Sequence, residues 1–177
     1  MIELRIRTNL PELRAVLAKG PERLRRAIVR GLNRAGEVVT KAAQKNLTRN
    51  RSVASGQLRA SMGWAVDQAR LRAAVGPGLA AKATGRGDVN YGFWVEHGRR
   101  PGLPPPVRAL RQWASRRAGA DPRLAYAIAA SIAIKGTRPA PFLVPALQDS
   151  ASAVQAVFEK ELRRELDAID REGGRAR

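Results

Sequence analysis

The chain has a single histidine, His97, which directly follows Glu96. A carboxylate beside an imidazole is a pairing that general acid–base catalysis can use. An enzyme would also need a nucleophile, a metal constellation or an oxyanion device, and none is recognisable in this sequence. On a helix, moreover, adjacent residues point in different directions. We therefore predict no catalytic residue and no enzymatic activity, and we assign Glu96 and His97 to a structural or interface role.

Other kinds of site chemistry also lack their residues. The chain contains no cysteine, which excludes disulfides, thiolate metal sites and cysteine nucleophiles. The glycine-rich stretches 76–78 and 85–87 lack the spacing of a phosphate-binding loop and its following Lys-Ser/Thr. Histidine and carboxylates nowhere cluster at metal-ligand spacing. The sequence predicts no metal, no cofactor and no small-molecule substrate.

Two segments stand out by composition, and the first is Tyr91–Gly98, Tyr-Gly-Phe-Trp-Val-Glu-His-Gly. Its residues Tyr91, Trp94 and Val95 recur at helical spacing, so a short helix could bury a large apolar area there. Gly98 can then end that helix in the left-handed conformation.

The second segment is Gly136–Leu147, an apolar run interrupted by three prolines, Pro139, Pro141 and Pro145. Each proline fixes its own φ, lacks a backbone donor and pushes its predecessor toward extended geometry. We predict an extended ribbon over Thr137–Val144. Pro145 suits the first turn of a helix, where its missing N–H would be unsatisfied anyway.

Three blocks in order, Ser55–Ser61 (Ser-Gly-Gln-Leu-Arg-Ala-Ser), Tyr91–Gly98 and Gly136–Leu147, precede a C-terminal helical pattern. This arrangement, which covers most of residues 20–170, resembles the tail-completion or neck proteins of long-tailed double-stranded DNA phages. None of the blocks is a catalytic signature, and their order carries more weight than any one block. The segment Pro104–Lys135 is a helical insertion longer than in the simplest members of that family.

The resemblance implies a structural protein of a phage or prophage virion, made in the host cytoplasm, that forms a ring at the head–tail junction. A hexamer is favoured and a dodecamer is possible. Its neighbours would be head-completion or portal-side proteins and tail-tube proteins, with weak nonspecific contact to double-stranded DNA in the channel. The expected subunit-interface residues are Tyr91, Phe93, Trp94, Pro139, Phe142 and Leu143.

Charged residues complete this interpretation. Glu96, beside aromatic residues, would be partly buried and need a partner, and the resemblance suggests a structural ion pair with Arg59. Arg86, Arg99 and Arg100 are expected to face DNA or an acidic partner ring.

The chain carries a net charge of +18, and 27 of its 33 basic residues are arginine. Such a charge predicts attraction to polyanions with strong salt dependence. The preference for arginine over lysine fits a GC-rich genome equally well, but the shortage of acidic residues does not follow from it. The alternative function is a cellular nucleic-acid-binding protein whose basic helix, with Arg23, Arg26, Arg30, Arg34 and Lys41, follows phosphates. The N-terminus lacks the apolar core of a signal peptide, and no apolar run is long enough to span a membrane.

The periodicities predict an α+β fold with a small antiparallel sheet packed against a long N-terminal helix and a C-terminal helix. Residues 2–6 alternate as a strand, a helix ends near Leu47, residues 61–76 form a hairpin, and the last helix starts at Pro145. Acidic residues near the end of that helix oppose its dipole, so we expect them to pair with arginines of the same helix or of a neighbouring subunit. The predicted organisation is one domain over residues 1–172, with a flexible loop at 79–90, the helical insertion at 104–135 and a disordered tail at 173–177.

Overall fold

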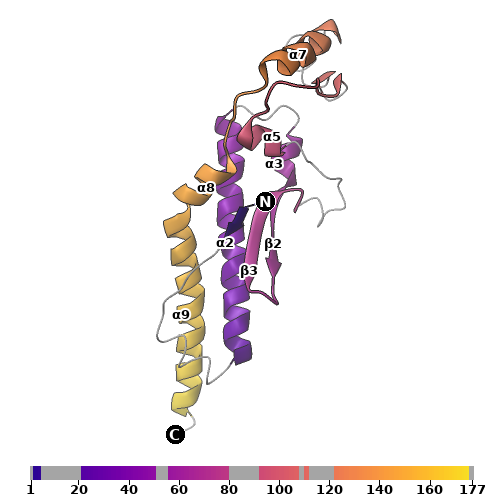
Figure 1. Cartoon of the computed structure of the whole chain (residues 1–177). Coiled ribbons are helices and arrows are strands. Elements are labelled where there is room, and N and C mark those ends of the chain that lie inside the picture. Colours follow the sequence, from indigo (N-terminus) through magenta and orange to yellow (C-terminus); the bar gives the residue numbers. More distant parts are fainter. Residues whose placement is uncertain are drawn as a thin grey trace.

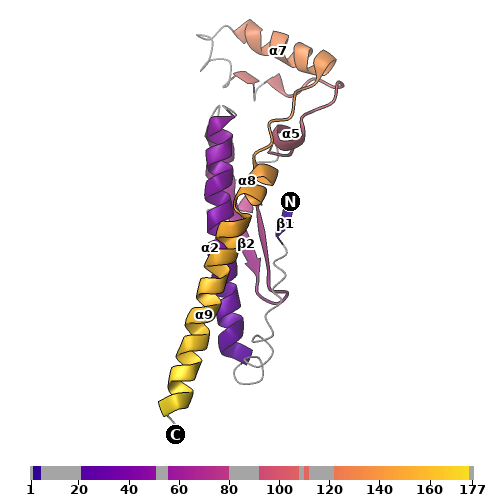
Figure 2. The ribbon, with the colours of Figure 1, turned by 90° about the vertical axis from the view of Figure 1, so that its left-hand side faces the viewer.

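Two long helices, α2 (Pro21–Arg49) and α9 (Ala151–Arg175), lie side by side along the length of the molecule (Figures 1 and 2). The computed structural model describes residues 2–4, 21–50, 56–79, 92–107, 110–111 and 122–175. The fold is α+β, with a sheet packed on α2 beside α9. No helix within these ranges is long and apolar enough to cross a membrane.

The sheet has three antiparallel strands in the order β1 (Ile2–Leu4), β3 (Arg72–Pro77), β2 (Met62–Asp67). The short helix α3 (Gln57–Ser61) leads directly into β2. β2 and β3 form the predicted hairpin, and the N-terminal strand pairs with β3. In the hairpin turn, Asp67 Oδ1 accepts hydrogen bonds from the N–H groups of Ala69 and Arg70 at 2.9 and 3.0 Å. Leu71 completes the turn with a φ of 51°. The alternating pattern therefore predicted the strands and the hairpin pairing, but not the pairing of β1 with β3.

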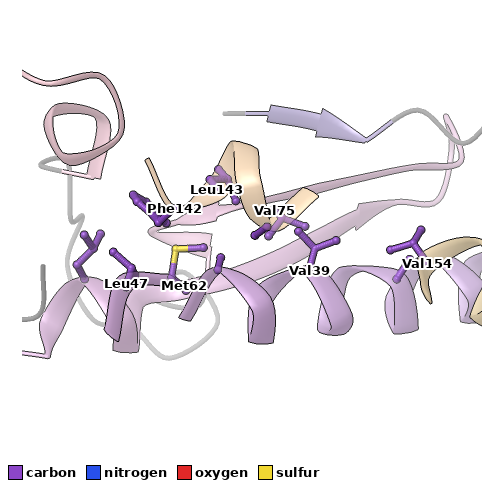
Figure 3. Close-up of a cluster of buried hydrophobic side chains, with 11 residues drawn as sticks. Val39, Leu47, Met62, Val75, Phe142, Leu143 and Val154 are labelled. Carbon is purple, nitrogen blue, oxygen red and sulfur yellow. The ribbon is translucent and has the colours of Figure 1, made fainter. Parts of the chain in front are cut away.

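One face of α2 forms most of the core. Its buried residues Ala35, Val39, Ala43 and Leu47 share a cluster with side chains from the sheet and from the start of α8 (Leu143–Asp149), as Figure 3 shows. The other members of this cluster are Leu58, Met62, Val75, Phe142, Leu143, Ala146 and Val154. A second cluster joins the first turns of α2 to α9 and β3 through Leu24, Ala27, Leu32, Ala73, Phe158 and Leu162.

The described residues between 98 and 140 form an arm between helix α5 (Gly92–His97) and α8. Its helix α7 (Pro122–Lys135) lies beyond the end of α2, apart from the α2–α9 pair in both views (Figures 1 and 2). The two limbs of the arm are joined by a β-bridge between Arg99 and Thr137 and by a 2.8 Å hydrogen bond from the N–H of Gly102 to Ala133 O. Part of the predicted insertion is thus helical and projects from the fold.

The segment boundaries predicted from the sequence agree with the structure only in part. Most of the loop predicted at 79–90 lies outside the described residues, as does most of the helix predicted to follow Pro104. The tail was predicted to be disordered from residue 173, but α9 continues to Arg175. Adding one residue to an established helix also adds a hydrogen bond, so two glycines, each costing about 1 kcal/mol, need not end it.

Candidate interaction surface

The carboxylate of Glu96 binds three consecutive backbone N–H groups in a distant segment. Glu96 lies on α5 and is buried, with 7% of its surface exposed. Its Oε2 accepts hydrogen bonds from the N–H groups of Phe142 at 2.8 Å and Leu143 at 2.9 Å, and its Oε1 accepts one from Val144 at 2.9 Å. Glu96 therefore joins two segments that are more than forty residues apart.

The three donors belong to the N-terminus of α8. Phe142 is the N-cap of this helix and provides no side-chain cap. A helix leaves its first four N–H groups without intrahelical acceptors. Glu96 binds the first three, and the fourth position is Pro145, which has no N–H. Every donor at this end is accounted for, and the negative charge lies where the helix dipole favours it.

The end of helix α2 and the residue that follows it also bind this segment. Asn46 Nδ2 donates to Phe142 O at 3.2 Å, and Asn50 Nδ2 donates to Pro141 O at 2.9 Å. From α5, Val95 O accepts the N–H of Ala140 at 2.8 Å. Neither asparagine was predicted as a site residue: Asn46 lies on the predicted helix, but Asn50 lies beyond the end predicted near Leu47.

Two predictions about this region are wrong in detail. The ribbon predicted over Thr137–Val144 ends earlier, because α8 already begins at Leu143. Pro145 does lie in the first turn, as predicted. The predicted ion pair between Arg59 and Glu96 is absent, because backbone donors occupy the carboxylate, while Arg59 Nη1 contacts Thr48 Oγ1 at 3.5 Å.

Two of the predicted interface residues belong to the core. Phe142 and Leu143 are 1% and 6% exposed, because they face the apolar side of α2 (Figure 3). A contact with another subunit needs exposed atoms, so the prediction for these two residues is wrong. Pro139 is exposed, as an interface residue must be. Tyr91 and Arg86 lie outside the described residues.

The side of α5 away from the core carries an exposed aromatic patch formed by Phe93, Trp94 and His97. Phe93 and Trp94 are 55% and 50% exposed, and their rings meet edge to face at 5.3 Å between centroids. The His97 ring lies 4.7 Å from that of Phe93, on the exposed side of a helix whose Glu96 points inward. The Arg99 guanidinium lies over Trp94 at 5.8 Å. This arrangement suits protein contact, because large rigid aromatic surfaces lose little entropy when they are covered.

Two glycines determine the backbone conformation at the base of the arm. Gly98 and Gly136 have φ values of 73° and 71°, and each ends a helix as predicted. A Cβ on Gly136 would lie 2.1 Å from Arg99 O, and one on Gly98 would lie 2.6 Å from Thr137 O. The bridge between Arg99 and Thr137 therefore requires glycine at both positions, for conformation and for space.

The arginines of the basic α2 stripe are largely paired with carboxylates of α9 in the same chain. Arg34 Nε lies 2.9 Å from Glu161, Arg30 Nη2 lies 2.5 Å from Glu165, and Arg23 Nη1 lies 2.5 Å from Glu172. The hydrogen bond from Arg23 lowers the pKa of Glu172, and the same bond raises the pKa of Arg23. Three acidic residues of α9 do pair with arginines, but the partners are on α2 of the same chain, whereas they were predicted within α9 or on a neighbouring subunit.

In the described part of the chain, no group of three or more histidine or carboxylate side chains could hold a metal ion. No protein-family model, curated protein or solved structure matches the chain. The site is therefore interpreted from its residues and geometry.

Proposed function

We propose that the chain is a structural virion protein of a tailed phage or prophage, and that its copies form a ring at the head–tail junction around the DNA channel. The order of the three sequence blocks supports this proposal, as does the exposed aromatic patch on α5. The mechanism is assembly by surface burial, with no chemical step.

A ring requires head-to-tail contacts, in which one patch meets a different patch on the next copy. Helix α5 and the N-terminus of α8 are joined by Glu96 into one unit, so these two segments supply one patch rather than two. The arm offers the second patch instead. Its residues Leu103, Tyr126 and Ile134 are 83%, 56% and 73% exposed. We therefore assign the head-to-tail contact to the aromatic patch of one copy and the arm of the next.

The aromatic patch is held in a fixed position, which favours its use as a contact surface. Helix α5 has only six residues and would be marginal alone. The three hydrogen bonds of Glu96 tie it to α8, and Ala140 ties it through Val95. A preordered surface loses less entropy on binding, so more of its burial appears as affinity.

Molar mass in solution tests the ring directly. Light scattering after size exclusion, with negative-stain imaging of large species, should reveal closed particles with an open centre and a mass several times 19.2 kDa. Because each copy carries a charge of +18, repulsion opposes assembly, and raising the salt from about 0.15 M to about 1 M should increase the ring fraction.

A matched pair of variants locates the contact. Replacing Phe93 and Trp94 together by Ser should reduce the particles to monomers, whereas Leu71→Ser, at an exposed apolar residue in the hairpin turn, should leave them assembled. Wild-type protein that stays monomeric at every concentration and salt would contradict a ring formed by the chain itself.

The alternative, a cellular nucleic-acid-binding protein, depended on the basic stripe of α2. Three arginines of that stripe, Arg23, Arg30 and Arg34, are engaged by α9 carboxylates, which leaves less positive charge there for phosphates. Tight, steeply salt-dependent DNA binding by the isolated monomer would favour this alternative over the ring.

A further inference from the structure

The described part of the arm carries six basic side chains and no acidic one. They are Arg99, Arg100, Arg111, Arg123, Lys135 and Arg138. Along α2, three arginines are paired with carboxylates, whereas Arg100, Lys135 and Arg138 on the arm have no ion-pair partner among the described residues. We propose that the arm-base cluster, defined as Arg100, Lys135 and Arg138, is the surface that contacts the phosphates of duplex DNA. This inference rests on the proposed function, because it names the DNA-facing side of each ring subunit.

The three residues are brought together by the bridge between the two limbs of the arm. Each is within two residues of Arg99 or Thr137, the pair that forms the bridge at the base of the arm. All three are exposed, and none has an ion-pair partner in the part of the chain that the structure describes. Mutual repulsion of unpaired cations is unfavourable, and a bound polyanion would relieve it.

The backbone under the cluster is fixed, so the charges are presented in one arrangement. Gly98 and Gly136 leave no room for a side chain between the limbs of the arm. Arg99, which was expected to face DNA, is engaged instead, because its Nη2 donates to Leu103 O and its guanidinium covers Trp94. Of the three arginines predicted from the sequence, Arg86 lies outside the described residues and Arg99 is engaged. Arg100 is exposed, and the structure adds Lys135 and Arg138.

Duplex DNA fits this cluster better than a second copy of the chain does. Each copy has a charge of +18, so another copy would be repelled by the cluster. Arginine forks match phosphate oxygens, and contacts to phosphate carry no sequence information. The expected binding is therefore weak and nonspecific, as a channel through which any sequence passes requires.

Fluorescence anisotropy with a mixed-sequence duplex, titrated between about 50 and about 200 mM salt, tests this assignment. The arm variant is Arg100→Gln, Lys135→Gln and Arg138→Gln together. The matched control is Lys160→Gln, Arg163→Gln and Arg164→Gln together, which removes two arginines and one lysine, all exposed, from α9. The measured quantity is the slope of log affinity against log salt concentration. The arm variant should reduce the magnitude of this slope by about 1 per removed contact, so by about 3 in all, and the control variant should reduce it by less than about 1.

The inference is overturned if both variants reduce the salt dependence of DNA affinity by the same amount, because net charge alone would then explain binding. It is also overturned if the wild type binds no duplex at about 50 mM salt, or binds only phosphatidylglycerol vesicles or an acidic protein surface. Urea unfolding of each variant shows whether the fold is intact. The ring itself is assessed separately by light scattering: a monomeric chain whose arm variant still loses the slope would refute the proposed function and retain the DNA-contacting cluster.

Discussion

Replacing Glu96 by Gln should destabilise the protein strongly without removing any apolar atom. The Gln carbonyl can take the place of Oε2 and accept the N–H groups of Phe142 and Leu143. Its NH2 group then faces the N–H of Val144, donor against donor. One charged hydrogen bond is lost, at about 1.5–3 kcal/mol, and the two that remain become neutral and weaker. Loss of the negative charge at a helix N-terminus adds about 0.3–1 kcal/mol, for a total of about 2–5 kcal/mol.

Urea denaturation followed by circular dichroism measures this cost. With a slope of about 2 kcal/mol per molar urea, the unfolding midpoint should fall by about 1–2.5 M. Glu22→Gln is the matched control, because it removes an exposed carboxylate in the first turn of α2, with no cost beyond the dipole term of at most about 1 kcal/mol. A midpoint for Glu96→Gln within about 0.3 M of that control would refute the capping role.

A double-mutant cycle separates this cap from the ion pair that the sequence suggested. Because Arg59 and Glu96 have different partners, the effects of Arg59→Gln and Glu96→Gln should add to within about 0.5 kcal/mol. A coupling well above that value would show that Arg59 stabilises the carboxylate after all.

Three further changes test other parts of the fold. Gly136→Ala should cost at least about 2 kcal/mol more than Gly56→Ala in urea unfolding, because both residues have φ near 70° but only at Gly136 would the new Cβ meet a backbone oxygen; equal costs would contradict the close contact at the arm base. Leu71→Asn should raise stability by about 0.5–1 kcal/mol in the same assay, since Asn tolerates positive φ better than Leu, and a loss of stability would show that the Leu71 side chain packs usefully. Because Arg23 lowers the pKa of Glu172 in the folded chain, that stabilisation is present above the carboxyl group's usual pKa and lost as pH falls through the lowered one. Thermal melts should therefore show a smaller decrease on acidification for Glu172→Gln than for the wild type.

The helices and strands could be predicted because the spacing of their apolar side chains matches the period of a helix or a strand. Alternation predicted the hairpin, and the apolar residues from Leu24 to Leu47 predicted α2. Glu96 shows where such reasoning stops. A buried carboxylate could be expected beside aromatic residues, but its partners are backbone N–H groups, which every residue except proline carries and no sequence pattern marks. Pro145 is the one feature of the sequence that fits this cap, because it removes the fourth N–H donor at the start of the helix.

The arm was predictable as an insertion but not as a projection. Its helical periodicity and its glycine stops are local features, and they appear in the sequence. Whether α7 packs on α2 depends on which apolar surface is already covered. The first core cluster, completed by Phe142 and Leu143, covers the end of α2 where the arm begins. These two residues were assigned to a subunit interface because they lie in an apolar segment that was expected to contact another copy of the chain.

The charge distributions of α2 and α9 are explained only when the two helices are considered together. Basic residues in the first half of α2 oppose its dipole, and acidic residues in the last half of α9 oppose that of α9. Near the start of α2, Arg23 pairs with Glu172 near the end of α9, and further along α2, Arg34 pairs with Glu161. The two helices are therefore antiparallel, and the basic half of α2 lies beside the acidic half of α9. Apolar contacts such as those of Phe158 supply the attraction, since ion pairs at the surface contribute little. The ion pairs instead favour one register, because sliding α9 by a turn would separate them, and they reduce the positive charge that these arginines present to other molecules.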